Sequence, residues 1–351
     1  MTSAPDIAYI FDPRFTGGTS AAIASELKVA VTLGRLQLHA RRSAMFSGQG
    51  VAPALRQTLD ALGLALIWDA PQISADVVIL HNPSFLRFQT DPHMRIVTRH
   101  LIVVAHENFL RPGKFESHDV RRCLDQIDQA TLALRKSIAP VSGHNRTTIA
   151  DWFAQNPGTS GWQILAQDWF NICDFPLVPP TAKPADRRGR HSRPGPEKFP
   201  PLGDLDLCFP ATAQSNVILG ADMLLAAGLD RPHWTMVPFR GLELASYFQM
   251  MDFMVYFTAL TWRESFGRVL AEGIAAGKVV VCDADTAATF GDAVVTTTPA
   301  QVDAVIAGFI SDPESYRDQV ARGQSWVGAH SPEAFRGRMA EVLKWRAGCN
   351  Q

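Results

Sequence analysis

The sequence predicts an α/β protein with two domains, each built on a parallel sheet that helices cover on both faces. Short apolar runs alternate along the chain with amphipathic stretches, and the apolar runs are nearly continuous. Strands of that composition are typical of parallel sheets, which are buried on both faces. The length of 351 residues is enough for about two domains at roughly 100–200 residues per domain.

Composition excludes several classes of protein. Apolar residues make up 46% and charged residues 19%, which suits a folded core and not a disordered chain. The net charge of −1 argues against a dedicated nucleic-acid binder. The sequence contains no run of about 18 uncharged apolar residues, so no membrane span is predicted. The first residues lack the basic-then-apolar order of a signal peptide. The five cysteines lack CxxC pairing and indicate neither a disulfide framework nor a zinc site. We therefore expect a cytoplasmic protein.

The first half of the chain supplies four apolar runs that predict buried strands, at 7–11, 77–80, 101–105 and 138–141. An amphipathic stretch at 20–33 follows the first run and predicts a helix. Residues 120–138 carry apolar side chains at 120, 124, 127, 134 and 138, a spacing that predicts a second helix.

One segment interrupts this alternation. Eight prolines lie between Asp174 and Gly203, and proline resists both helix and central strand. We therefore place a domain junction at 174–203, between an N-terminal domain (1–173) and a C-terminal domain (204–332). Residues 333–351 predict a last helix. In open parallel sheets, ligands bind beyond the carboxyl ends of the strands, so functional residues are expected in the loops there.

Residues 253–282 predict a compact βαβ unit: a strand at 253–257, a helix from about 265 to 276, and a strand at 278–282, with a further strand at 293–296. A helix N-terminus presents free N–H groups and a partial positive charge, which suits a diphosphate. Gly267 in the first turn leaves room for a ligand, and Glu264 precedes that turn. Glu272 follows about 12 Å further along the axis, a separation that suits a ribose diol.

Those two glutamates also have an ordinary structural interpretation. Residues 261–264 fit a capping box, and Glu272 fits a solvated helix position. The wider pattern is more specific, because Glu264 and Glu272 enclose Ser265-Phe266-Gly267 and are followed by Ala-Ala-Gly. This segment resembles the signature of retaining GT-B glycosyltransferases, especially family 4.

The resemblance implies two Rossmann-like domains with parallel sheets that face each other across a cleft. It also implies that the last helix, within 333–351, crosses back to the N-terminal domain. It implies that Glu264 contacts the donor sugar and that Glu272 holds the ribose. The intervening residues Ser265, Phe266 and Gly267 would bind the donor diphosphate.

Two further sites in the first half are similar to family landmarks. Gly17 and Gly18 follow the first strand, where the family has a glycine loop near the donor phosphate; a simple turn is the alternative. His106 follows the strand at 101–105, and the resemblance places it beside the transferred sugar; the alternative is a histidine that only caps the strand end. His81, at the end of another strand, is expected to be structural.

The family also places an arginine and a lysine in the first loop of the second domain, where they neutralise charge on the diphosphate. Lys198 matches that lysine, and either Arg190 or Arg193 matches the arginine. The preceding residues 181–189 are polar and contain proline, which is not the pattern of a buried strand. An arginine-rich interdomain linker is therefore the alternative.

Two remaining patterns suggest other partners. Asp283-Ala-Asp285 looks like the metal-binding DxD of GT-A glycosyltransferases, but it follows the βαβ unit, and we interpret it as a loop. Cations flank the apolar stripe of the helix predicted at 120–138, an arrangement that suits peripheral contact with an anionic membrane; the alternative is a helix with a solvated face. These cations are Arg121, Arg122, Arg135 and Lys136.

The function implied by the resemblance is retaining transfer of a sugar from a UDP- or GDP-type nucleotide sugar to an acceptor hydroxyl. A glycan or lipid-linked acceptor in surface polysaccharide biosynthesis is the expectation. Helix N–H groups and cations would do the work that a metal does elsewhere, so no metal or other cofactor is expected. The alternatives are a nucleotide-sugar epimerase of the same fold, a GT-A-type metal enzyme, and a non-catalytic sugar-nucleotide or glycan-binding scaffold.

Overall fold

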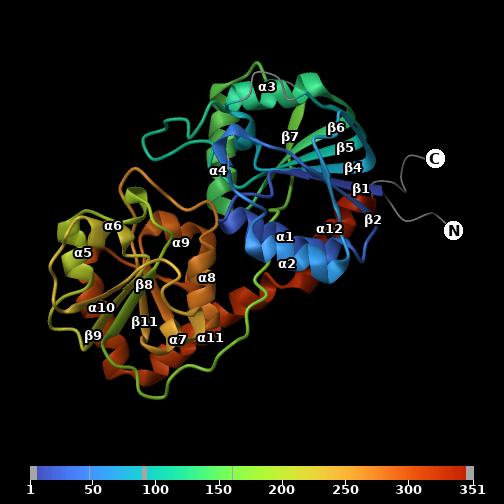
Figure 1. Cartoon of the computed structure of the whole chain (residues 1–351). Helices are drawn as coiled ribbons and strands as arrows, with labels where there is room; N and C mark the ends of the chain where they lie inside the picture. Colours follow the sequence, from blue (N-terminus) through green and yellow to red (C-terminus); the bar gives the residue numbers. More distant parts are fainter. Residues whose placement is uncertain (1–5, 47, 89–92, 160, 345–351) are drawn as a thin grey trace. The chain divides into compact units, whose positions relative to one another are not determined.

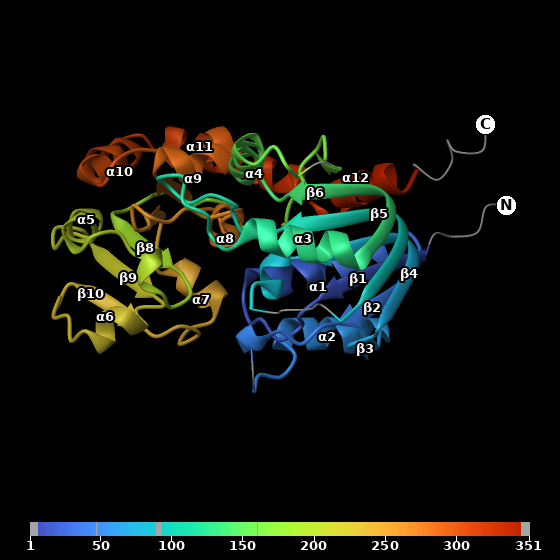
Figure 2. The same cartoon turned by 90° about the horizontal axis from the view of Figure 1, so that it is seen from above.

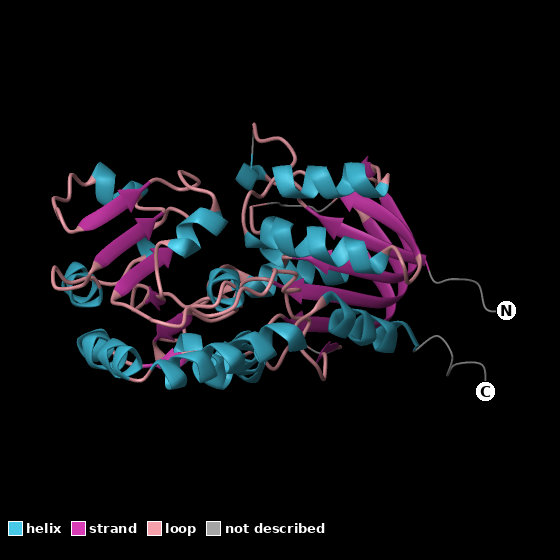
Figure 3. Cartoon of the chain, turned by 90° about the horizontal axis from the view of Figure 1, so that it is seen from below, coloured by secondary structure: helices cyan, strands magenta, loops and turns pink. Residues whose placement is uncertain are grey.

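The computed structural model describes residues 6–46, 48–88, 93–159 and 161–344. The chain forms two compact units (Figure 1). The first contains Met1–Ile172 and His330–Gln351, and the second is Cys173–Ala329. Each unit has one parallel sheet with helices packed around it (Figure 3). Among the described residues, no helix combines the length and apolar character needed to cross a membrane.

The first unit has a seven-stranded sheet in the order β3-β2-β1-β4-β5-β6-β7. Its strands are β1 (Asp6–Phe11), β2 (Arg35–Ala40), β3 (Leu66–Trp68), β4 (Gln72–His81), β5 (Arg95–Ala105), β6 (Thr131–Pro140) and β7 (Trp162–Ile164). Its helices are α1 (Gly18–Ala30), α2 (Pro53–Leu62), α3 (Val120–Ala130), α4 (Gly143–Gln155) and α12 (Pro332–Lys344), with short turns η1 (Ala44–Phe46) and η2 (Pro83–Leu86).

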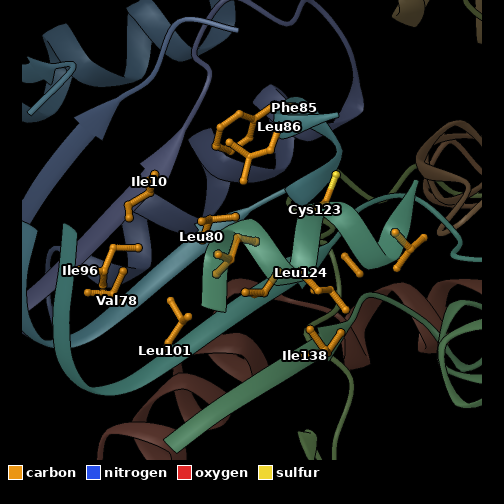
Figure 4. Packing of buried hydrophobic residues seen from close by; sticks show 14 of the residues in the cluster. Ile10, Val78, Leu80, Phe85, Leu86, Ile96, Leu101, Cys123, Leu124 and Ile138 are labelled. Atoms are coloured by element: carbon orange, nitrogen blue, oxygen red, sulfur yellow. The ribbon is translucent and has the colours of Figure 1, made fainter. Parts of the chain in front are cut away.

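The core of this unit lies between α3 and the central strands, and α3 runs along one face of the sheet (Figure 2). Cys123 and Leu124 of α3 pack over Leu80, Leu101 and Ile138, which come from three neighbouring strands (Figure 4). All five side chains are fully buried. Burial of each such side chain stabilises the fold by about 1.5–3 kcal/mol.

The second unit has a six-stranded sheet in the order β10-β9-β8-β11-β12-β13. Its strands are β8 (Arg187–His191), β9 (Ser215–Leu219), β10 (Trp234–Val237), β11 (Phe253–Tyr256), β12 (Val279–Cys282) and β13 (Val295–Thr296). Its helices are α5 (Leu202–Cys208), α6 (Asp222–Ala226), α7 (Leu244–Gln249), α8 (Arg268–Ala275), α9 (Ala284–Phe290), α10 (Val302–Ser311) and α11 (Pro313–Ala329), with turns η3 (Pro196–Lys198), η4 (Gly291–Ala293) and η5 (Pro299–Gln301).

Both sheets contain a point at which the order of strands reverses. In the first unit this point lies between β1 and β4, and in the second it lies between β8 and β11. The loops that leave the two strands at such a point diverge to opposite sides, which leaves a crevice at the carboxyl edge of the sheet where ligands of α/β proteins bind. The fold therefore directs attention to the loops after β1, β4, β8 and β11.

Two predictions about local structure were wrong. The helix expected at 120–138 ends at Ala130, and β6 begins at Thr131 and pairs along its length with β5. The cations flanking the predicted stripe therefore do not lie on one helix, because Arg135 and Lys136 belong to the strand. The expected loop at Asp283 is instead the start of α9, with the Asp283 side chain accepting a hydrogen bond from the Thr286 N–H.

The segment assigned to the junction also contains a strand that its sequence did not indicate. β8 lies inside the second sheet, between β9 and β11. Its buried Arg188 is tolerated because Asp186 and Asp303 both form ion pairs with the guanidinium. Toward the C-terminus, α12 covers residues 333–344 of the helix expected at 333–351; residues 345–351 lie outside the described residues.

Candidate active site

The loop between β11 and α8 is shaped by Gly267, which has φ +84° and occupies the N-cap position of the helix. An added Cβ at this glycine would lie 3.1 Å from the Phe290 ring and 3.3 Å from Leu270. Phe266 is buried, with its ring 6.3 Å from that of Phe290 and 6.0 Å from that of Trp326. The Phe266 side chain therefore anchors the turn, and only its backbone is left for a ligand. The helix predicted from Ser265 starts three residues later because Gly267 is left-handed.

Glu264 lies in the same loop and is held by two donors. Its Oε1 accepts hydrogen bonds from Lys198 Nζ at 2.6 Å and from the Tyr256 hydroxyl at 2.6 Å. Burial alone would raise the pKa of Glu264, but the charge of Lys198 and these two hydrogen bonds outweigh it and hold the pKa below its usual value. The carboxylate is therefore ionised at neutral pH and acts as an acceptor. Glu264 does not cap α8, so the capping-box interpretation was wrong.

Lys198 comes from η3, at the end of the loop that follows β8. Its side chain is only 8% exposed, and its Nζ lies 4.8 Å from the centre of the Trp262 ring. Since β8 and β11 are adjacent parallel strands, Lys198 and Glu264 meet at the carboxyl edge of the sheet, at the point where the strand order reverses. The structure thus brings together two residues that are 66 positions apart.

Arg190 lies beneath this pair and does not reach the surface. It is fully buried and donates hydrogen bonds to the carbonyl oxygens of Phe257 and Lys198. Its guanidinium lies 4.3 Å from the Phe199 ring centre and 5.0 Å from that of Tyr256. Burial lowers the pKa of Arg190. Arg190 therefore fixes the backbone at Lys198, and of the two arginines considered for the diphosphate it is the fully enclosed one.

Arg193 is the more accessible of the two arginines considered for this loop. Its side chain is 44% exposed and forms an ion pair of 2.8 Å with Glu197. Exposed pairs of this kind contribute little to stability, so the guanidinium can exchange Glu197 for another anion. The linker interpretation of this loop is not supported, because β8, Arg190 and Lys198 are integral parts of the second unit.

Glu272 lies on α8 with a side chain that is 14% exposed. Arg268 pairs with it at 3.3 Å and also lies 3.7 Å from Asp174, while its guanidinium packs 4.6 Å from the Phe175 ring centre. Burial raises the pKa of Glu272 in spite of Arg268. Glu272 is thus a buried, positioned carboxylate and not the solvated residue that was its alternative interpretation.

In the first unit, Gly17 and Gly18 begin α1 directly after the loop that follows β1. An added Cβ at Gly17 would lie 2.4 Å from the Phe15 ring, whereas nothing lies within 4 Å of one at Gly18. A side chain at Gly17 would therefore meet the Phe15 ring. The second position leaves free space beside the N-terminus of the helix.

His106 follows β5 and contacts a buried polar chain. Its Nε2 lies 2.9 Å from Nδ1 of His81, the last residue of β4. Nε2 of His81 lies 3.5 Å from Oε1 of Glu26 on α1. Burial, and then the electrostatic influence of His81, lower the pKa of His106 well below its usual value, so its ring is neutral at neutral pH. Glu26 was missed in the sequence, although an acidic residue within a mostly apolar helix pattern could have marked it.

The Asp283-Ala-Asp285 pattern is used structurally. Asp283 accepts hydrogen bonds from the backbone and the hydroxyl of Thr286, both at 2.9 Å. Asp285 forms an ion pair of 2.8 Å with Arg263. Within the ranges that the structure describes, no group of three or more His, Cys, Asp or Glu side chains has the arrangement of a metal site.

Comparison with known proteins identifies the architecture. No protein-family profile matches the chain, and no curated protein matches it significantly. Among solved structures, HepE of Anabaena, in complex with UDP and glucose, superposes with a TM-score of 0.67 at 15% identity, covering 97% of this chain and 99% of HepE. The chain has a GT-B fold. The GT-A alternative is therefore wrong.

Two further structures show the breadth of this likeness. WaaG, a glycosyltransferase involved in lipopolysaccharide biosynthesis, matches with a TM-score of 0.54 at 12% identity, covering 96% of this chain and 99% of WaaG. The N-terminal domain of a Candida albicans trehalose-6-phosphate phosphatase matches with a TM-score of 0.60 at 10% identity, covering 98% and 97% of the two chains. At such identities the likeness shows the fold alone.

Proposed function

We propose that this chain is a retaining glycosyltransferase that moves a sugar from a UDP- or GDP-type nucleotide sugar to an acceptor hydroxyl. The observation that carries this proposal is the Lys198–Glu264 pair beside the first turn of α8, at the carboxyl edge between β8 and β11. The complexes solved for structurally similar proteins are consistent with it, since HepE was crystallised with UDP-glucose and GtfA with UDP and GlcNAc.

The donor diphosphate is assigned to Lys198, Arg193 and the N-terminal turn of α8. A departing nucleoside diphosphate gains negative charge, and cations and free helix N–H groups stabilise that charge where it develops. Lys198 is already held in the site by Arg190 and Glu264, so it needs little reorganisation to contact a phosphate. The residue segment Ser265, Phe266 and Gly267 contributes its backbone to this turn.

The two glutamates are assigned to the remaining parts of the donor, Glu264 to the sugar and Glu272 to the ribose. Glu264 is an ionised acceptor that suits hydrogen bonds from sugar hydroxyls, and both of its recorded donors bind Oε1. Glu272, positioned by Arg268, suits the two hydroxyls of a ribose. Because the pKa of Glu264 is lowered, this residue does not serve as the general acid of the reaction.

The reaction proposed is front-face transfer. The bond between C1 of the sugar and the β-phosphate oxygen breaks, and the acceptor oxygen bonds to C1 on the same face, so that configuration is retained. The acceptor proton passes to the departing phosphate oxygen. His106 and the loop at Gly17 and Gly18 are assigned by the family resemblance to the transferred sugar and the donor phosphate, and a glycan or lipid-linked acceptor is assigned in the same way.

Release of nucleoside diphosphate from a panel of UDP- and GDP-sugars, with and without acceptor hydroxyls, tests this proposal. We expect release that increases with acceptor concentration and a product of retained configuration. Sugar interconversion without an acceptor would instead indicate an epimerase. Donor binding without any turnover would indicate a non-catalytic scaffold.

A further inference from the structure

A chain of three polar side chains connects α1 to the end of β5 inside the first unit. Glu26 on α1 faces His81 at the end of β4, and His81 contacts His106 directly after β5. Glu26 and His81 are only 4% and 1% exposed. Tyr9 stacks on the His81 ring at 5.6 Å and 10°, and the His106 ring lies 5.2 Å away from that of His81. Glu26, His81 and His106 therefore follow one another in that order.

The carboxylate of Glu26 has donors on both oxygens. Its Oε1 accepts from the Tyr9 hydroxyl at 2.8 Å, and its Oε2 accepts from the indole N–H of Trp169 at 2.9 Å. Both oxygens thus act as acceptors, as the oxygens of a carboxylate do. The nitrogen of His81 that faces Oε1 must therefore carry its proton, because a lone pair there would be repelled by the carboxylate.

The position of the proton on His81 in turn determines the position of the proton on His106. A neutral imidazole carries one N–H and one lone pair. We take His81 as neutral, in which case a proton on its Nε2 leaves its Nδ1 as an acceptor. The 2.9 Å contact then requires His106 Nε2 to donate. In a neutral His106, the proton on Nε2 leaves Nδ1 with a lone pair. Among the described residues, none hydrogen-bonds to His106 Nδ1, and the residue is half-buried.

We propose that Glu26 and His81 are positioning residues that fix the tautomer of His106, so that His106 Nδ1 accepts a hydrogen bond from a hydroxyl of a carbohydrate ligand. The ligand rests on the proposed function, whereas the tautomer rests only on the contacts within the first unit. A hydroxyl is the matching chemistry, because a neutral nitrogen lone pair needs a donor and forms no ion pair. Sequence patterns could not have shown this, since the three residues are far apart in the chain.

Glu26→Gln is a sharp test because Trp169 determines how the new amide lies. The Trp169 indole N–H only donates, so the amide oxygen must face it and the amide nitrogen must take the place of Oε1. That nitrogen donates to His81 Nε2, which forces the proton of His81 onto Nδ1. His106 Nε2 then accepts, and the proton of His106 moves to Nδ1. The variant should thus reverse the tautomer of both rings.

Tyr9→Phe is the matched control. It removes one hydrogen bond from the same carboxylate, at 2.8 Å, but leaves the charge of Glu26 in place. It should leave both tautomers unchanged. Nitrogen-15 correlation spectra of the labelled full-length chain at neutral pH, with His106 assigned from a His106→Asn variant, report which nitrogen of each ring is protonated.

Spectra of the unmodified protein alone test the predicted tautomer of His106. A protonated Nε2 and an unprotonated Nδ1 on His106 are expected, and the opposite tautomer would overturn the inference, whether or not Glu26→Gln folds. An unchanged tautomer in Glu26→Gln, or a changed one in Tyr9→Phe, would also overturn it.

The ligand is tested separately. If sugar transfer is observed, Glu26→Gln should lower kcat/KM about tenfold or more, because Nδ1–H would then oppose a hydroxyl that must donate. Tyr9→Phe should change it less than about threefold. An equal loss in both variants would contradict the role of Nδ1. If the unmodified protein transfers no sugar, the proposed function fails, while the tautomer result stands or falls by the spectra.

Discussion

Removal of Lys198 should destabilise the second unit chiefly by stranding a buried charge. In Lys198→Met, the one donor left to Glu264 within the described part of the chain is the Tyr256 hydroxyl, although the Glu264 side chain is just 16% exposed. Loss of one partner of a buried pair costs about 3–5 kcal/mol, and the residual exposure favours the lower end. For a unit of this size, each kcal/mol shifts Tm by about 2–4 °C, so a cost near 3 kcal/mol predicts a fall of about 6–12 °C.

The double variant Lys198→Met with Glu264→Gln separates this explanation from a simple loss of packing. It removes the stranded carboxylate together with its partner, so we expect part of the lost Tm to return. Arg193→Met is the matched control, because the pair of Arg193 with Glu197 is partly exposed. Its loss should cost no more than about 1 kcal/mol, which corresponds to a fall in Tm of no more than about 2–4 °C. Thermal unfolding followed by circular dichroism measures all four proteins. Equal falls for Lys198→Met and Arg193→Met, or a double variant whose Tm is no higher than that of Lys198→Met, would refute the reasoning.

Three further predictions concern the loop and helix around this pair. Glu264→Ala should lower kcat about 10–150-fold, the loss of one or two charge-assisted hydrogen bonds, while UDP or GDP still binds; an unchanged rate would exclude the role of Glu264. Glu272→Ala should weaken nucleotide binding about tenfold in titration calorimetry, and an unchanged Kd would exclude the ribose contact. Gly267→Ala should destabilise the chain by about 1–2 kcal/mol, because residue 267 has φ +84°. Gly18→Ala is the control and should not destabilise the chain, because a Cβ there meets open space. Similar Tm values for both variants would argue against strain at Gly267.

The strands that the sequence indicated are those with continuous apolar side chains. Runs such as 7–11 and 253–257 are buried on both faces, so their composition alone marks them. β8 was missed because its residues are mostly charged. It is stable in the sheet because Asp186 and Asp303 neutralise Arg188, and Asp303 lies far along the chain. No local pattern contains that information.

The end of α3 shows a second limit of sequence patterns. The apolar positions 134 and 138 continue the helical spacing of α3, yet residues 131–140 pair with β5 as a strand. Leu134 is 78% exposed and Ile138 is buried within β6, so these two positions do not continue the buried face that Val120, Leu124 and Ile127 form on α3. Pairing with β5 determined the structure here, and spacing alone favoured the wrong period.

In the candidate site too, residues within one short motif could be picked out from the sequence, whereas contacts between distant segments could not. Glu264, Gly267 and Glu272 were found because they lie in one short motif, and the structure positions each of them within or beside α8. The burial of Arg190 depends on Phe199 and Tyr256, which approach it from other segments. The chain of Glu26, His81 and His106 likewise exists only because α1, β4 and β5 meet at one edge of the first sheet.

The most direct test of the account compares a nucleoside diphosphate with its nucleoside in two proteins. Titration calorimetry gives Kd for UDP and uridine, or for GDP and guanosine, with the unmodified chain and with Lys198→Met. If Lys198 binds the diphosphate, the substitution should weaken binding of the diphosphate about 10–150-fold, which corresponds to about 1.5–3 kcal/mol for a charged hydrogen bond, and leave nucleoside binding unchanged. Equal affinity of both proteins for the diphosphate would contradict the central claim.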